Sequence, residues 1–402
     1  MVDEFVYQYQ ETQRWKAQYA KDIVANPAAL EALRSGSNAW RCSDVLSLLT
    51  RLIQTSGIKQ YLTNEQRQRQ HPAASVNPRL VEEPDLPVTL GYFGIISLMR
   101  LHVAMGDYRA ALTVGSLIEL SPTGLYWKVP AAHITLFYNL GFAYMMMRRY
   151  QDAIRVLSQI LTFLGRSRSY LSTQSYQQDA MLRMTERMYH LVLLCNALSP
   201  TRLDETIQVH IQDHLADKHF KLQSDEEDAY REVFLKAAPK FFNPFVSDYS
   251  NPQETIGIDK DEPTNRQVNM FLKDASYQNK VFNVRSIAKL YNNLTLTKLS
   301  NLMGLKQENA VEIVRSEMLC VKNRAEQLIW RSGPLLSGER VQMLADLDIY
   351  LETDTIHVKN LTTQRSYIDY FIKQIHRTQD LLNNANAPTR PEVKKQPTAV
   401  AD

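Results

Sequence analysis

Glycine, cysteine and net charge are all scarce in this chain of 402 residues. It has 13 glycines, and its apolar residues recur at steps of three and four, so the sequence predicts a mostly helical protein with a single, late β-hairpin signal. Its three cysteines, Cys42, Cys195 and Cys320, lie far apart and form no CxxC pair, which indicates reduced thiols and a cytoplasmic protein. A formal charge of +3 creates no whole-molecule field that favours a polyanionic partner.

Hydrophobic runs long enough to span a membrane are also missing. No uncharged stretch that is apolar throughout approaches the roughly twenty residues that a bilayer-spanning helix needs. The opening segment, MVDEFVYQYQ, contains two acidic residues and no apolar core flanked by basic ones, so it does not resemble a signal peptide. We therefore expect a soluble protein with no membrane partner.

The residue patterns of common enzyme sites are absent from the sequence. It has no G-x-S-x-G motif and no plausible cysteine–histidine pair. Residues 333–339, GPLLSGE, resemble a phosphate-binding loop but have Glu339 at the position of the essential lysine. We therefore expect no enzyme, no catalytic residues, no cofactor and no small-molecule substrate.

One histidine cluster has the spacing of a metal site. His210 and His214 stand four residues apart on a predicted helix, near His219, Asp213 and Asp217, which is a usable geometry for zinc. The segment HIQDH lacks the glutamate that a metalloprotease uses as its base. A solvated helix face explains the same pattern, so we predict no metal site.

The most informative stretch that is present is residues 139–157, NLGFAYMMMRRYQDAIRVL. With the residue at 137, it follows the W-x2-L-G-x2-Y and A-x3-F spacing of a tetratricopeptide-type helical hairpin. The matching residues are Phe137, Leu140, Gly141, Tyr144, Tyr150, Ala153 and Leu157. Such a hairpin cannot bury its apolar face alone, so it predicts a stack of helices, and such stacks usually bind other macromolecules.

A second, degenerate copy precedes this hairpin. Residues 90–105 predict a helix, Gly106 and Asp107 predict a tight turn, and Tyr108 opens the next helix. Tyr108 and Tyr150 are 42 residues apart, against about 34 in the regular repeat, and residues 121–130 contain the excess. We place TPR-like helical repeats at residues 89–241, with further helices at 174–198, 203–217 and 226–238.

Composition marks the other boundaries. Residues 1–62 form an N-terminal helical segment with a helix at 38–54. Residues 63–88 and 242–264 are rich in proline and polar residues and predict two loops. Residues 387–402 predict a disordered tail.

The C-terminal part predicts a winged helix over residues 265–362. Short helices at 284–291 and 296–303 and a turn at Gly304 lead to a long helix at 307–330. The expected buried stripe of the long helix is Ala310, Val314, Met318, Val321, Ala325 and Leu328. Residues 348–359 alternate with period two and predict the β-hairpin. A last helix, at 363–386, has a more apolar stripe than a terminal helix needs, so we expect it to dock on a partner.

A helical array followed by a winged helix is the order of PCI domains, the scaffold modules of the proteasome lid, the signalosome and translation initiation factor 3. Several blocks of the sequence, in the family's order, resemble the L-subunit family of eukaryotic translation initiation factor 3. They are DEFVYQYQ, LGYFGIISLMRLHVAMGDY, GFAYMMMRRYQDAIRVL, RSIAKLYNNLTLTKLSNLMGL and DYFIKQIHR. The resemblance runs from Asp3 to about Leu382. Members of that family carry a further segment before the first block, so contacts made by that segment are not transferred.

The resemblance implies a non-catalytic scaffold subunit that supports preinitiation complex formation on the small ribosomal subunit and mRNA recruitment. It also implies assembly through the PCI module beside subunits K and E, with the last helix in a shared bundle. The candidate interface therefore combines the edge of the predicted hairpin with the stripe of the last helix. Its residues are Ile349, Leu351, Ile356, Val358, Ile368, Phe371, Ile372, Ile375 and Leu382.

A free-standing winged-helix RNA-binding protein is the alternative from another class. A helix-turn-helix places its longer helix in a groove, where basic residues meet phosphates. The candidates for RNA contact are Lys298, Lys306, Arg315, Lys322 and Arg324. Glutamates are interleaved on the same helix, so a solvated face or a protein contact explains these cations as well. The sequence leaves both hypotheses open.

Overall fold

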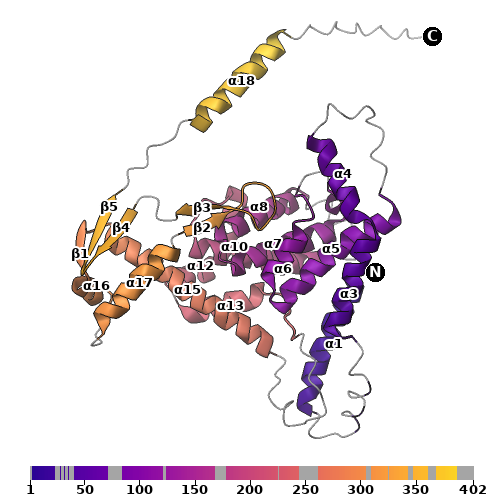
Figure 1. Cartoon of the computed structure of the whole chain (residues 1–402), viewed down its shortest axis with the longest axis horizontal. Helices are drawn as coiled ribbons and strands as arrows, with labels where there is room; N and C mark the ends of the chain where they lie inside the picture. The colour runs from indigo at the N-terminus through magenta and orange to yellow at the C-terminus, as the bar shows by residue number, and fades with distance from the viewer. Residues whose placement is uncertain are drawn as a thin grey trace, which may run out of the picture.

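The computed structural model describes residues 2–22, 28, 31, 35, 40–70, 84–120, 124–167, 178–224, 226–243, 261–304, 309–324, 326–342, 347–360 and 368–386. The chain is mostly helical, as the sequence predicts. Figure 1 shows a stack of helices from the first two thirds of the chain, a smaller lobe of helices and strands beside it, and α18 (Ile368–Asn386) standing apart from both.

The N-terminal helices pack around α5 (Leu86–Met105). They are α1 (Val2–Asp22), α3 (Cys42–Thr55) and α4 (Ile58–Gln70). The predicted loop at 63–88 is wrong at both ends, because residues 63–70 continue α4 and α5 already begins at Leu86; its middle lies outside the described residues. The end of α4 is polar, but its Glu, Gln and Arg residues are strong helix formers and include no glycine or proline.

α5 is the central helix of the larger core. By length and composition alone it is apolar enough to cross a membrane, so the expectation that no run is long enough to span one is wrong for this helix. Here it is surrounded by α1, α3, α4, α6 (Tyr108–Gly115) and α7 (Pro130–Met146). Ile95, Met99 and Leu101 are fully buried. A helix that is hydrophobic on all sides is expected in such a position, because every face meets another helix.

The turn between α5 and α6 forms as the sequence predicts. Gly106 has a φ of +87°, and the Asp107 side chain caps α6 by accepting a hydrogen bond from the Ala110 amide at 3.0 Å. The longer connection predicted at 121–130 contains a short 3-10 helix, η2 (Leu125–Lys128). Its Tyr126 is buried against the ring of His133 in α7, which anchors the connection to the stack.

α7 and α8 (Tyr150–Arg166) are the two helices predicted from residues 139–157, and they pack against each other. Gly141 lies at their closest approach. A Cβ added to Gly141 would lie 2.6 Å from Cγ of Leu157. The absence of a side chain at Gly141 therefore sets the spacing of the hairpin.

Four further helices among the described residues belong to the stack. They are α10 (Gln178–Leu198), α11 (Glu205–His214), α12 (Ala216–Gln223) and α13 (Glu227–Ala237). The single helix predicted at 203–217 is wrong, because the chain leaves helical geometry at Leu215 and begins α12 directly after it. Leu215 is buried, so packing at the corner outweighs the continuous local pattern.

α15 (Glu262–Ala288) joins the stack to the smaller lobe. The sequence predicted a loop up to 264 and a helix only from 284, whereas one helix of 27 residues covers this region. Val268 and Phe271 belong to the larger core, and Val281 and Val284 belong to the second core. At 3.6 residues per turn the two pairs lie on opposite sides of the helix, so no single apolar stripe revealed it.

The smaller lobe surrounds a three-stranded antiparallel sheet in the order β1-β5-β4. Its elements are β1 (Asn293–Thr295), α16 (Leu296–Leu302), α17 (Ala310–Arg324), β4 (Leu347–Glu352) and β5 (Thr355–Asn360). Leu294 lies opposite Ile356, and Ile349 lies opposite Val358. The hairpin predicted at 348–359 is confirmed, while the winged-helix assignment stays a prediction. β1 was not predicted, because three residues are too short to show a period.

The long helix predicted at 307–330 ends earlier than expected. α17 stops at Arg324, and β2 (Glu326–Ile329) pairs with β3 (Glu339–Gln342), so the expectation of a single hairpin signal is also wrong. Four members of the predicted stripe are buried, namely Ala310, Val314, Met318 and Val321. Leu328 instead lies in β2 and is 41% exposed, while Ala325 and the predicted tail at 387–402 lie outside the described residues. The partner strand comes ten residues after β2 ends, so local periodicity did not show it.

We expect Gly141→Ala to destabilise the helical stack, because the added methyl group would overlap the branched end of Leu157 in the core. The free energy of unfolding should fall by about 1–3 kcal/mol. Gly165→Ala is the matched control, since a Cβ at Gly165 in α8 meets no atom within 4 Å and should stabilise the helix by up to about 1 kcal/mol. Urea denaturation of both variants measures the difference, and an unchanged midpoint for Gly141→Ala would refute the close approach.

Candidate functional site

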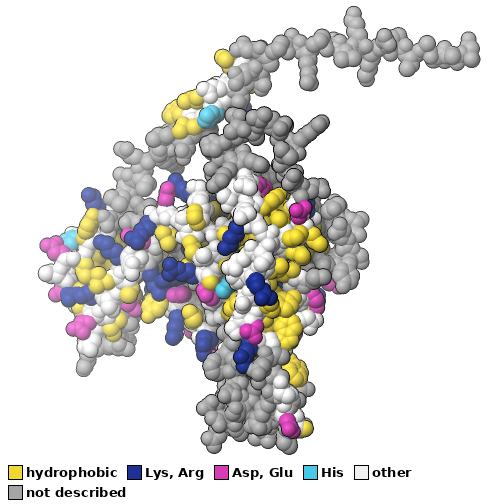
Figure 2. Space-filling view, turned by 45° about the vertical axis from the view of Figure 1, so that its right-hand side comes forward, with side chains coloured by type: hydrophobic (Ala, Val, Ile, Leu, Met, Phe, Trp, Pro, Cys, Tyr) yellow, Lys and Arg dark blue, Asp and Glu magenta, His cyan; other side chains and the backbone are white. Residues whose placement is uncertain are grey.

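The large apolar side chains along one face of α18 are exposed. Phe371, Ile372, Ile375 and Leu382 are between 47% and 62% exposed, and the side chain of Ile368 lies outside the described residues. Figure 2 shows hydrophobic side chains on α18 at a distance from the rest of the described chain. A cluster of large apolar side chains on a separate helix typically marks a protein interface.

The sheet contributes a different surface from the one predicted. β5 pairs on both sides, and its Ile356 and Val358 are buried in the second core, so these two residues are not interface residues. Ile349 and Leu351 of β4 are half-buried and pack against the same core. Alternation identified the inward face of the hairpin correctly, but that face covers the lobe's own helices. Among the described strands, none pairs with the outer edge of β4, which is the remaining candidate surface.

The basic residues proposed for RNA contact are mostly engaged within the lobe. Arg315 forms an ion pair with Asp354 at 2.7 Å, and Arg324 forms one with Asp274 at 3.2 Å. Lys298 lies over the ring of Tyr291, and Lys322 lies over the ring of Tyr350 and donates a hydrogen bond to the carbonyl of Ile349 at 3.4 Å. Lys306 lies outside the described residues. These contacts favour a structural role for the four described cations.

Among the described residues, no three His, Cys, Asp or Glu side chains lie together in a way that could hold a metal ion. His210 stacks on Tyr189 with ring centroids 3.7 Å apart, and His214 packs beside it at 4.6 Å. Aromatic packing therefore accounts for the spacing of these two imidazoles.

A feature that the sequence did not reveal joins the helical stack to the loop between β2 and β3. We call it the clamp, and it consists of Arg149, Asp152, Tyr144 and the loop residues 330–338. Arg149 and Asp152 form an ion pair at 2.8 Å with only 4% and 1% of their side chains exposed. Arg149 also donates hydrogen bonds to the carbonyls of Leu335 at 3.0 Å and Ser337 at 2.9 Å.

The polar side-chain atoms of Asp152 and Tyr144 in the clamp also have hydrogen-bond partners. Both carboxylate oxygens of Asp152 accept from the amide of Trp330, at 2.9 and 3.0 Å. The hydroxyl of Tyr144 donates to the carbonyl of Leu335 at 3.0 Å. Burial raises the pKa of Tyr144, while the neighbouring Arg149 acts in the opposite direction, so the phenol keeps the proton that it donates.

The clamp uses the segment that resembles a phosphate-binding loop. In place of a nucleotide, this loop inserts Leu335 into the larger core, where the side chain is 3% exposed. An Arg-x-x-Asp pair inside an apolar stretch is a signal that sequence reasoning could have used. Its partner carbonyls lie about 190 residues further along the chain, and nothing local indicates them.

Comparisons with known proteins match almost the whole chain. Residues 1–378 match the family model described as RNA polymerase I-associated factor PAF67. The chain is 36% identical to eukaryotic translation initiation factor 3 subunit L of Mycosarcoma maydis, over 98% of this chain and 58% of that protein. It is 33% identical to the same subunit of Xenopus tropicalis, over 95% and 66%, and 31% identical to that of Nematostella vectensis, over 96% and 71%. The chain thus spans less than two thirds of the length of the first two relatives.

We expect Asp152→Asn to loosen the clamp, because it leaves the guanidinium of Arg149 buried without a counter-charge. The free energy of unfolding should fall by about 3–5 kcal/mol, and the amide of Trp330 should exchange its hydrogen faster. Asp3→Asn is the control, since the Arg100–Asp3 pair has 72% of the aspartate side chain exposed and should change stability by less than about 1 kcal/mol. Equal melting temperatures for the two variants would show that the clamp contributes nothing.

Proposed function

Because the chain belongs to the eukaryotic translation initiation factor 3 subunit L family, we propose that this translation initiation factor subunit is a non-catalytic scaffold of the complex in the cytoplasm. In this proposal it assembles with other PCI subunits, with subunits K and E as neighbours. It supports binding of the small ribosomal subunit and mRNA recruitment, and it needs no cofactor.

The observation that carries the proposal is the exposed apolar stripe of α18. Its large hydrophobic side chains have no cover among the described residues, and the helix stands apart from the rest of the chain (Figure 1). A helix of this kind docks by placing its apolar face in a groove or a helical bundle. The unpaired edge of β4 adds a second contact of a different chemistry, because strand pairing uses backbone hydrogen bonds.

The clamp supports the same role in a second way. It fixes the β2–β3 loop on α7 and α8, and α15 connects the two cores as one continuous helix. The smaller lobe is therefore held at a defined angle to the stack. A scaffold needs such rigidity, because its partners must meet it in fixed positions.

The winged-helix RNA-binding alternative receives less support. Its four described cations already have partners within the lobe. Asp354 pairs with Arg315 and Asp274 pairs with Arg324. Glu317 pairs with a further lysine, Lys280. A surface of this kind lacks the excess of free positive charge on which strong phosphate binding depends.

Purification of a tagged chain from its own cells tests the scaffold role. We expect other subunits of the factor and small ribosomal subunits to copurify at stoichiometric levels. Recovery of the folded chain as a monomer, free of both, would overturn the proposal.

We expect the double variant Ile372→Asp, Ile375→Asp to dissociate from its partner subunits, because two charges would have to be buried in the apolar contact. Affinity should fall at least a hundredfold, a change of about 3 kcal/mol. Arg377→Asp is the control, as it adds an aspartate on the opposite side of α18. Copurification measures assembly, and the melting temperature of the free chain should stay unchanged because the stripe is exposed there. Normal assembly of the double variant would rule out α18 as the contact.

A further inference from the structure

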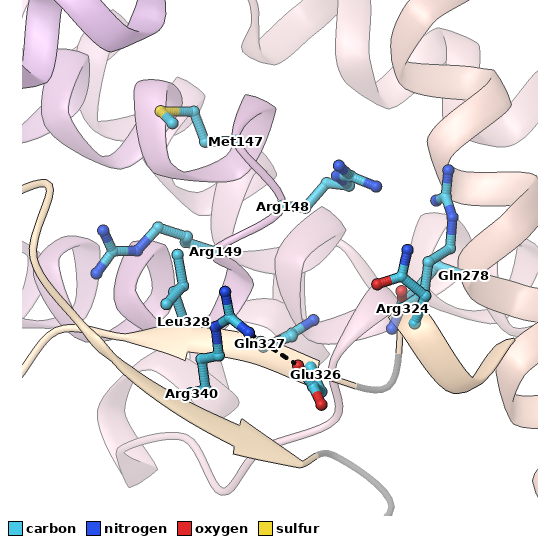
Figure 3. A pocket seen from close by; sticks show the side chains of 10 residues that line it. Met147, Arg148, Arg149, Gln278, Arg324, Glu326, Gln327, Leu328 and Arg340 are labelled. Atoms are coloured by element: carbon cyan, nitrogen blue, oxygen red, sulfur yellow. Dashed lines mark ion pairs between the residues drawn. The ribbon is translucent and has the colours of Figure 1, made fainter. Parts of the chain in front are cut away.

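A pocket of about 430 Å³ lies where the helical stack meets the smaller lobe. The turn between α7 and α8 forms one side, β2 and β3 form the opposite side, and α15 and the end of α17 form the third (Figure 3). This volume lies within the range of small-ligand sites. The pocket plays no part in the assembly proposed above, so the two ideas can fail independently.

Guanidinium groups dominate the wall of the pocket. Arg149 and Arg324 are held by Asp152 and Asp274, respectively. Arg340 and Arg148 are bound less firmly by acidic side chains. The ion pair of Arg340 with Glu326 is long, at 3.8 Å, and 80% of the arginine side chain is exposed. Arg148 forms no ion pair with the described residues. Two guanidinium groups are therefore available for an anion from opposite walls.

A buried acceptor in the same wall has no donor. Gln327 is 7% exposed, and its Oε1 is buried without a hydrogen-bond partner among the described residues. Leaving a buried acceptor unpaired is unfavourable, so a ligand that displaces the covering side chains and donates a hydrogen bond to this oxygen would gain affinity. One nitrogen of Arg324, Nη1, is also buried without an acceptor. The pocket thus favours a ligand that has an anionic group and a donor close together.

The backbone at Arg148 supports a functional role for its side chain. The residue ends α7 with a φ of +62°, and the amide of Arg149 reaches back to the carbonyl of Tyr144 at 2.9 Å. Glycine is the usual residue at this left-handed position of a helix end, because other side chains are strained there. An arginine in this strained position that also lines a pocket points to a use for its charge.

We propose that this pocket binds one nucleotide of single-stranded RNA, with the phosphate between Arg148 and Arg340 and the 2′-hydroxyl donating to Gln327. Forked guanidinium groups suit the oxygens of a phosphate. The 2′-hydroxyl lies on the sugar carbon next to the one that carries the 3′-phosphate, so one rigid unit supplies both groups. Met147 and Leu328 add apolar surface for the sugar or base. In an acidic peptide, by contrast, the carboxylate is joined to the backbone N–H by a flexible side chain.

Fluorescence anisotropy of the full chain with labelled oligouridylate of about twelve nucleotides, at about 150 mM salt, tests the site. We expect micromolar binding that falls about tenfold in Arg148→Gly and in Arg340→Ala. Arg266→Ala removes an exposed charge on α15 outside the pocket and should change the dissociation constant less than about twofold. Arg148→Gly should also raise the melting temperature slightly, because glycine relieves the strain. Weaker binding by a more stable protein cannot result from unfolding.

The second arm of the experiment identifies the donor. Oligodeoxyuridylate of the same length should bind about fivefold more weakly, and Gln327→Leu should remove most of this difference between RNA and DNA. Equal affinity of the unmodified chain for both oligonucleotides would overturn the assignment of Gln327. Unaltered RNA binding by Arg148→Gly would reject the RNA site. Displacement of the RNA by an equal concentration of short polyglutamate would also reject it, and would indicate an acidic peptide as the ligand instead.

Discussion

The buried ion pair of Arg149 and Asp152 is the interaction on which the placement of the C-terminal half depends. A charge removed from water must be matched by partners, and these two side chains take theirs from the loop between β2 and β3. The loop cannot leave α7 and α8 without exposing Leu335 and stranding both charges. Hydrogen bonds to the buried charges and the burial of Leu335 therefore hold the same β2–β3 loop in place.

With the clamp and α15 together, the smaller lobe is attached to the helical stack at two separate places. One attachment is a helix shared by both cores, and the other is a loop inserted into the larger core. Two attachments resist rotation far better than one. The sheet edge of β4 thus has a defined direction relative to the stack, whereas α18 follows the lobe outside both cores (Figure 1). The fold combines a rigid body with an apolar helix beyond it.

The sequence was informative wherever one local rule decided the structure. The spacing around Gly141, the turn at Gly106 and the alternation from Ile349 to Val358 all predicted the elements that form. It failed where distant residues decide. α15 changes its buried face between two cores, β2 depends on a later strand, and the clamp joins residues about 190 positions apart. The candidate interface shows the same limit, since Ile356 looked like a surface residue until β1 was found beside it.

The clamp also has a consequence for the order in which the chain folds during synthesis. Tyr144 and Arg149 leave the ribosome long before the loop that satisfies them, 191 residues later in the case of Tyr144 and Leu335. At about 5–20 residues per second, this interval is on the order of ten to forty seconds. During that time the place that Leu335 later fills in the larger core is open, and the Arg149–Asp152 ion pair is still in contact with water. The finished stack is thus a product of the whole chain, and until the loop arrives its first half exposes apolar surface of the kind that makes folding intermediates prone to aggregate.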